Sequence, residues 1–183
     1  MNRERPIVVA LQKFVEQDPQ SLHVPGHKNG IFSNLPSDIK VAMAYDLTEL
    51  KGLDDYHHPE EVIARGQELL AEAYQAERSF FLVNGSTVGN LAMIYTVASV
   101  GDIVIVQRNA HKSIFHALEL VGANPVYIAP EWDEGSLTAG SVQTATLQEA
   151  LKRYPEAKAI VLTYPTYYGV ASQELAAQID LCH

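Results

Sequence analysis

The sequence predicts an α/β fold in which helices cover both faces of a mostly parallel sheet. From residue 80 onward, short apolar runs alternate with helical patterns, and the runs are nearly continuous in aliphatic residues. Strands that are buried on both faces have this composition. Of the 183 residues, 47% are hydrophobic and 19% are charged, which is ample for a packed core.

Four strands and the helices between them account for residues 80–182. The strands are expected at Phe80–Val83, Asp102–Gln107, Asn124–Ala129 and Ala159–Pro165. The helices are expected at about Thr87–Ser99, at Lys112–Val121, from Thr146 onward, and from a cap at Ser172 to near Cys182. Thr146 and Glu149 have the spacing of a capping box, so we expect the third of these helices to open there.

The first part of the chain is less regular. Short helices are expected over Pro6–Gln17 and over Pro59–Gln75, the second with its proline at the first helical position. Between them, prolines and glycines punctuate residues 21–55, which predicts an extended segment of loops and short turns. We therefore expect an N-terminal helix and arm over residues 1–55 and the first part of a larger domain over residues 56–183.

Charge and cysteine content exclude several classes of protein. The net charge of −9 and the absence of any Lys/Arg run disfavour a nucleic-acid-binding protein. The single cysteine, Cys182, excludes an internal disulfide and fits a reducing compartment. No signal-peptide core and no 18-residue apolar run occurs, so we expect a soluble, cytoplasmic protein that does not bind membranes.

The turn after the first predicted strand is a candidate anion site. Asn84 and Gly85 end the strand, and Ser86 and Thr87 stand where a helix begins. Unpaired N–H groups at a helix N-terminus attract phosphate, glycine allows close approach, and hydroxyls add donors. The alternative is that Ser86 or Thr87 only caps the helix. The turn matches neither the Walker pattern nor the dinucleotide-binding glycine pattern.

Two further loops follow predicted strands. His111 comes after the second strand, where it could lie against a flat ligand, donate a hydrogen bond or act as an acid or base. Thr166 comes after the fourth strand, among tyrosines. Taken singly, His111 could be a surface histidine and Thr166 part of a turn of packed aromatics. Because all three loops belong to one predicted sheet edge, we expect a shared ligand cleft.

The early histidines and carboxylates invite other interpretations. The histidines are His23, His27, His57 and His58, and their spacing matches no familiar zinc pattern, so no metal is expected. The carboxylates are Asp46, Glu49, Asp54 and Asp55. They could contact a cationic substrate or form a solvated acidic face.

Five segments, taken in order, resemble the N-terminal motifs of the ornithine/lysine/arginine decarboxylases. They read HVPGHKNG, DLTELKGLDDYHHP, FFLVNGSTVGNLAMI, RNAHKSIFHAL and LTYPTYYG, and the resemblance runs from about Leu22 to the end of the chain. It implies a fold-type-I, aspartate-aminotransferase-like large domain with three layers, incomplete at its C-terminus. It also implies a pyridoxal 5'-phosphate cofactor and decarboxylation of arginine, lysine or ornithine to an amine, as in polyamine biosynthesis.

The resemblance assigns roles to the loops. Gly85, Ser86 and Thr87 would hold the cofactor phosphate, His111 would stack on the pyridine ring, and Thr166 would lie beside the cofactor. The segment His23–Gly30 would belong to an arm that packs on the large domain and on a partner in a homodimer or larger homo-oligomer.

Two motifs of the resembled family do not occur in these 183 residues. They are the Asp-Glu-Ala-His-like motif, whose aspartate faces the pyridinium nitrogen, and the Ser-x-His-Lys motif, whose lysine forms the Schiff base. Lys112 is only a lookalike, because its loop matches the ring-stacking motif. We therefore expect a short-form member without a wing domain, inactive as these 183 residues alone. The alternatives are another fold-type-I enzyme, such as an aminotransferase or lyase, and a non-catalytic truncated remnant.

Overall fold

The computed structural model describes residues 4–32 and 34–182. They form two compact units, one that ends at Phe81 and one that begins at Leu82. Each unit is described by itself below. No helix in the described ranges is long and apolar enough to cross a bilayer.

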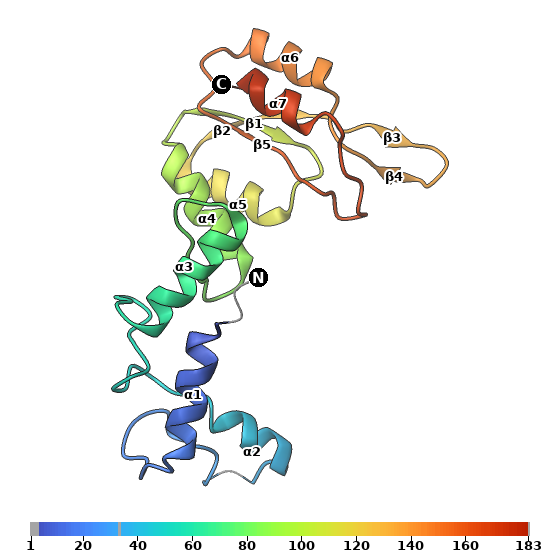
Figure 1. The fold of residues 1–183 in the computed structure, drawn as a ribbon. Helices are drawn as coiled ribbons and strands as arrows, with labels where there is room; N and C mark the ends of the chain where they lie inside the picture. The colour runs from blue at the N-terminus through green and yellow to red at the C-terminus, as the bar shows by residue number, and fades with distance from the viewer. Residues whose placement is uncertain (1–3, 33, 183) are drawn as a thin grey trace. The chain divides into compact units, whose positions relative to one another are not determined.

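The first unit contains three helices (Figure 1): α1 (Pro6–Glu16), α2 (Ser37–Met43) and α3 (Val62–Tyr74). α1 confirms the predicted first helix, with its proline at the start of the helix. α1 packs against α3. α2 lies inside the segment expected to hold only loops and short turns, so that expectation was incomplete.

α3 begins later than the sequence pattern suggests. The expected start at Pro59 is wrong, because the backbone N–H groups before the helix are bound to a side chain rather than to solvent or a ligand. The carboxylate of Asp54 accepts from the N–H groups of Glu60 at 3.0 Å and Glu61 at 2.8 Å, and also from that of Ile63 at 2.9 Å. The helix ends as expected, with Gln75 in a left-handed conformation at its C-cap.

The second unit is built on a parallel sheet in the order β2-β1-β5. The strands are β1 (Ile103–Gln107), β2 (Asn124–Ile128) and β5 (Ala159–Val161). The helices α4 (Ser86–Val97) and α5 (Lys112–Val121) lie on one face, and α6 (Thr144–Arg153) and α7 (Leu175–Cys182) lie on the other (Figure 1). This arrangement confirms the predicted three-layer α/β fold.

The middle strand explains why both faces are covered. Val104 and Val106 of β1 point into a cluster with Ile94 of α4 and Leu118 of α5. Ile105 points the other way, into a cluster that includes Leu147 of α6. Successive strand residues alternate between faces, so a strand of aliphatic residues buries both.

The first predicted strand is wrong. Residues Phe80–Val83 do not form a strand, and Phe80 and Leu82 are more than half exposed. A strand needs a neighbour to take its backbone hydrogen bonds, and no described strand pairs with these residues. The fourth predicted strand is present but ends at Val161 rather than Pro165.

The polar segment after β2 contains a hairpin that the sequence reading missed. Its strands are β3 (Trp132–Asp133) and β4 (Thr138–Ala139), paired antiparallel. The side chain of Asp133 accepts from the N–H groups of Gly135 at 2.7 Å and Ser136 at 3.0 Å. Such a local carboxylate bond shapes the turn.

The predicted capping box is wrong. α6 begins at Thr144, so Thr146 lies inside the helix and caps nothing. The N-terminus of α6 is instead bound by Glu174, whose carboxylate accepts from the N–H of Thr144 at 3.0 Å and from its hydroxyl at 2.6 Å. These bonds lower the pKa of Glu174, the hydroxyl bond being the larger cause.

The last helix also begins later than expected. α7 starts at Leu175, and the hydroxyl of Ser172 accepts from the N–H of Glu174, one residue before the helix. Ser172 therefore shapes the approach to α7 rather than capping it.

Candidate cofactor site

The predicted phosphate turn opens α4. Gly85 is the N-cap residue, at φ 74° and ψ 178°, a conformation that is essentially restricted to glycine. A Cβ atom built on Gly85 meets nothing within 4 Å, so the space beside the turn is open. The backbone conformation therefore explains why residue 85 is glycine, since no neighbouring atom would clash with a side chain there.

The backbone N–H groups of Ser86 and Thr87 in this turn have no acceptor among the described residues. No side chain caps α4. Both residues are exposed. The alternative that Ser86 or Thr87 merely caps the helix is therefore excluded. Open backbone donors, two hydroxyls and the positive end of a helix dipole together fit a phosphate.

His111 is the N-cap residue of α5. Its Nδ1 atom accepts from the backbone N–H of Ser113 at 3.2 Å, so the imidazole satisfies one N–H at the start of the helix. His111 is exposed, whereas Ser113 is 1% exposed. The imidazole is thus bonded to Ser113 through Nδ1, while His111 itself is exposed to solvent.

One side-chain hydrogen bond brings the two helix N-termini together. Asn90 of α4 donates through Nδ2 to Oγ of Ser113 at 2.8 Å. Asn90 lies one turn after Ser86, and Ser113 lies two residues after His111. This bond links the helix that opens at Ser86 to the start of the helix that His111 caps. The prediction that both loops follow strands of one sheet is wrong for the Gly85 turn, because residues 80–83 form no strand.

The loop that carries Thr166 follows β5, which lies directly beside β1. Gln107 at the end of β1 links the two loops, because its Oε1 accepts from the N–H of Thr163 at 3.1 Å. Thr166 is 4% exposed, and its Oγ1 accepts from the N–H of Val170 at 3.2 Å. Thr166 thus holds its own turn in shape at the same edge.

Sequence reasoning missed the residues that join these loops. Asn90, Ser113 and Gln107 each bond a residue more than twenty positions away. A polar glutamine at the end of an aliphatic strand was the one signal in the sequence. Asn90 and Ser113 look like ordinary polar residues of helix starts.

The early carboxylates have partners of their own in the first unit. Asp46 lies 3.0 Å from Nε2 of His27, and Thr48 donates to the carboxylate of Glu49. That hydroxyl bond is the main cause of a lowered pKa of Glu49. Within the described ranges, no three His, Cys, Asp or Glu residues form a group that could hold a metal ion.

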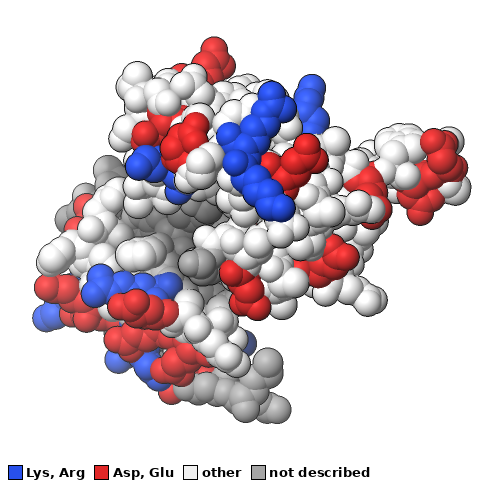
Figure 2. All heavy atoms as spheres, turned by 90° about the horizontal axis from the view of Figure 1, so that it is seen from above, with Lys and Arg blue, Asp and Glu red and all other residues white. Residues whose placement is uncertain are grey.

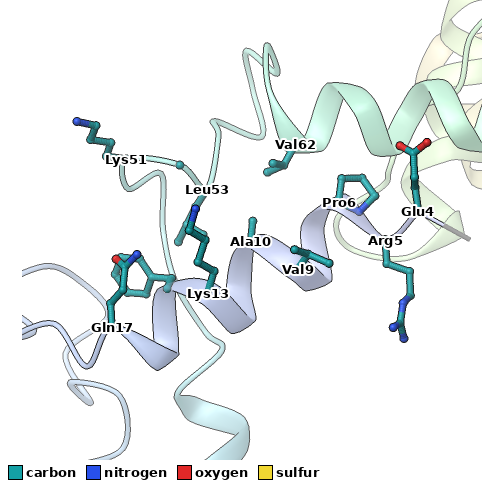
Figure 3. A pocket seen from close by; sticks show the side chains of 12 residues that line it. Glu4, Arg5, Pro6, Val9, Ala10, Lys13, Gln17, Lys51, Leu53 and Val62 are labelled. Atoms are coloured by element: carbon teal, nitrogen blue, oxygen red, sulfur yellow. The ribbon is translucent and has the colours of Figure 1, made fainter.

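One cavity of the first unit lies apart from the predicted site residues. It has a volume of about 730 Å³ and lies in the first unit, beside α1 (Figure 3). Its lining is apolar at Val9, Leu53 and Val62, with Lys13 and Lys51 at its border. On the face drawn in Figure 2, acidic side chains lie beside the lysines and arginines.

Known proteins resemble this chain over nearly its whole length. Residues 5–182 match the family model described as Orn/Lys/Arg decarboxylase, major domain. The uncharacterized protein YaaO of Bacillus subtilis (strain 168) is 51% identical over 166 residues, covering 90% of this chain and 35% of that protein. The arginine decarboxylase of the same organism is 34% identical over 185 residues, covering 98% of this chain and 37% of the enzyme.

A solved structure shares the fold. The constitutive lysine decarboxylase of Escherichia coli matches with a TM-score of 0.75 at 21% identity, over 90% of this chain and 25% of that chain. The fold is therefore that of a fold-type-I large domain. The chain belongs to the Orn/Lys/Arg decarboxylase family. It spans about a third of the length of the curated relatives it matches.

Proposed function

We propose that the full-length protein decarboxylates a basic amino acid, arginine, lysine or ornithine, with pyridoxal 5'-phosphate as cofactor. Family membership supports the reaction class. The observation that carries the cofactor assignment is the bond from Asn90 to Ser113, which joins the helix that opens with the N–H groups of Ser86 and Thr87 to the start of the helix that His111 caps. When bound, the cofactor supplies an electron sink for the carbanion that loss of carbon dioxide leaves.

The residues of this chain would bind and orient the cofactor. Gly85, Ser86 and Thr87 would hold the phosphate through backbone and hydroxyl donors, and the ring of His111 would lie against the pyridine. Thr166 would shape the loop beside the cofactor. We further propose that these 183 residues do not turn over substrate alone, because none of their lysines stands in the family's Ser-x-His-Lys motif.

Residues 1–55 are proposed as the arm of a homodimer or higher homo-oligomer, and residues 56–183 as the first part of the cofactor-binding domain. Large apolar side chains of the arm support this proposal, since Leu22 is 83% exposed and Phe32 is 79% exposed. Large apolar side chains that lie exposed are enriched at protein interfaces.

The cofactor assignment is tested by binding. In the full-length protein, Ser86→Ala combined with Thr87→Val should weaken pyridoxal phosphate binding roughly tenfold or more, because each hydroxyl bonds a charged group. Thr96→Val is the matched control on the same helix, since the hydroxyl of Thr96 bonds the carbonyl of Ala92. Equal cofactor affinity in the double variant and the wild type would remove the assignment.

The substrate and the catalytic lysine are tested by activity and trapping. Release of carbon dioxide from carboxyl-labelled arginine, lysine and ornithine identifies the preferred substrate. Borohydride treatment with pyridoxal phosphate should mark a lysine outside these 183 residues. A stoichiometric adduct on Lys112 would contradict the proposal. If the coding sequence shows no Asp-x-Ala-His or Ser-x-His-Lys motif beyond residue 183, the non-catalytic alternative is favoured.

A further inference from the structure

A relay of three side chains runs from α4 to His111. Asn90 donates through Nδ2 to Oγ of Ser113 at 2.8 Å, and that Oγ lies 2.8 Å from Nδ1 of His111. The backbone N–H of Ser113 donates to the same Nδ1 at 3.2 Å. Because Ser113 is 1% exposed, its hydroxyl has these side chains as partners instead of bulk water.

The direction of the relay follows from the backbone. A backbone N–H can only donate, so Nδ1 of His111 must offer its lone pair. The amide of Asn90 donates to Ser113, which leaves the hydroxyl proton of Ser113 free to point at Nδ1 as well. Two donors therefore converge on Nδ1, and a proton on that atom would oppose both.

We propose that Ser113 and Asn90 are positioning residues that hold His111 in its neutral Nε2–H tautomer, with the plane of the ring set. No described residue bonds Nε2, so its N–H remains available at the exposed edge of the ring. The value of this device for catalysis rests on the proposed function, in which the ring lies against the cofactor. The tautomer itself needs no cofactor.

The relay also ties the ring to the phosphate turn. Asn90 lies on the helix that begins at Ser86, one turn further along. The residues proposed to bind the phosphate and the residue proposed to lie against the pyridine ring thus belong to one hydrogen-bonded unit.

The test is nitrogen NMR of the histidine rings in the full-length protein without cofactor, at about pH 9, where an ordinary imidazole is neutral. The variant His111→Gln assigns the signals of His111. We expect the Nε2–H tautomer to dominate. A dominant Nδ1–H tautomer would overturn the proposal.

Two variants probe the relay. In Asn90→Asp the carboxylate only accepts, so the hydroxyl of Ser113 turns toward it and no longer donates to His111. Ser113→Ala removes that donor outright. Each should shift the tautomer ratio toward Nδ1–H by about threefold to tenfold, the effect of one hydrogen bond. Ser136→Ala is the control, since the hydroxyl of Ser136 bonds Thr138 in the hairpin.

The outcomes separate this inference from the proposed function. Asn90→Asp preserves the shape of the side chain. If the tautomer ratio of His111 is unchanged in this variant, the relay is refuted, whether or not the protein binds cofactor. This result alone decides the question if Ser113→Ala fails to fold. Shifted ratios, together with a full-length protein that binds no pyridoxal phosphate, would support the relay and refute the proposed function.

Discussion

Gly85 shows how a single residue sets the geometry of the candidate site. Its φ of 74° and ψ of 178° turn the chain so that Ser86 and Thr87 open α4 with unpaired N–H groups. Residues other than glycine are strained in this region by roughly 1–3 kcal/mol. The backbone conformation therefore requires glycine here, although a larger side chain would meet no neighbouring atom within 4 Å.

Gly85→Ala should lower the free energy of unfolding by about 1–3 kcal/mol, because alanine is strained in this conformation. Urea unfolding measures the change. Gly140→Ala is the matched control in the same unit, since its Cβ would make only ordinary contacts, the nearest at 3.6 Å to the carbonyl oxygen of Glu131, and its φ is not positive. Equal losses in both variants would show that strain at Gly85 is not the cause.

The start of α3 illustrates control at the scale of an element. Asp54 binds the N-terminal N–H groups of a helix from eight residues before it begins. Partial burial raises the pKa of its carboxyl, but the N–H groups of Glu60, Glu61, Asp55 and Ile63 outweigh that effect and lower the pKa to about 2. The carboxylate thereby replaces the local cap that the helix lacks.

The depressed pKa of Asp54 makes the first unit sensitive to acid. The folded value of about 2 lies below the ordinary value of 3.8, so the stabilisation is present above about pH 4 and is lost as the pH falls toward 2. Asp54→Asn should cost about 1–2 kcal/mol at neutral pH, after allowance for solvent screening, and should flatten the pH dependence in that window. Unfolding monitored by circular dichroism from about pH 2 to pH 7 measures both effects.

The control for Asp54 is Asp18→Asn, because Asp18 is exposed and its side chain bonds no described residue. This variant should keep the stability and the acid response of the wild type. An Asp54→Asn protein with an unchanged acid response would show that another carboxyl governs this window.

A second long-range hydrogen bond within the first unit connects the turn before α3 to the segment after this helix. The hydroxyl of Tyr56 donates to the carbonyl of Phe81 at 2.6 Å. Tyr56→Phe should lower stability by about 1 kcal/mol, since it leaves a partly buried carbonyl without this donor. Tyr45→Phe is the matched control, because the hydroxyl of Tyr45 bonds no described residue. If hydrogen exchange near Phe81 is equally slow in Tyr56→Phe and the wild type, the bond does not hold the segment.

At the scale of the whole molecule, the two units differ in how much they bury. Within the described ranges, the buried apolar side chains of the first unit are Leu53 and Ala71, whereas the second unit buries both faces of its sheet. The apolar surface that the first unit leaves exposed is typical of a surface that another surface covers. This contrast agrees with the proposed role of residues 1–55 as the arm of an oligomer.

Phe32→Asp should shift the full-length protein toward a smaller assembly, because a charge at a buried interface position is costly. Light scattering after size-exclusion chromatography measures the mass. Tyr74→Asp is the control, since Tyr74 is equally exposed, at 78%, but lies at the end of α3 outside the arm. An unchanged mass in Phe32→Asp would exclude Phe32 from the interface, and loss of assembly in both variants would point to general destabilisation.

The sequence by itself determined the alternation of strands and helices, the layered fold and the three loops that carry the candidate site. The strand β1 and the helix α5 were predictable because apolar periodicity is a local property that one segment displays alone. The glycine-containing turn was predictable for the same reason, since Gly85 meets a local backbone demand.

The tertiary structure decided what depends on residues far apart in the chain. Residues 80–83 have the composition of a strand, but pairing requires a neighbour that no described segment provides. Asp54 and Glu174 bind the starts of α3 and α6, in place of the proline at residue 59 and the capping box that the sequence suggested. The relay from Asn90 to His111 was likewise hidden, because a hydrogen bond between two helices leaves no periodic trace in either one.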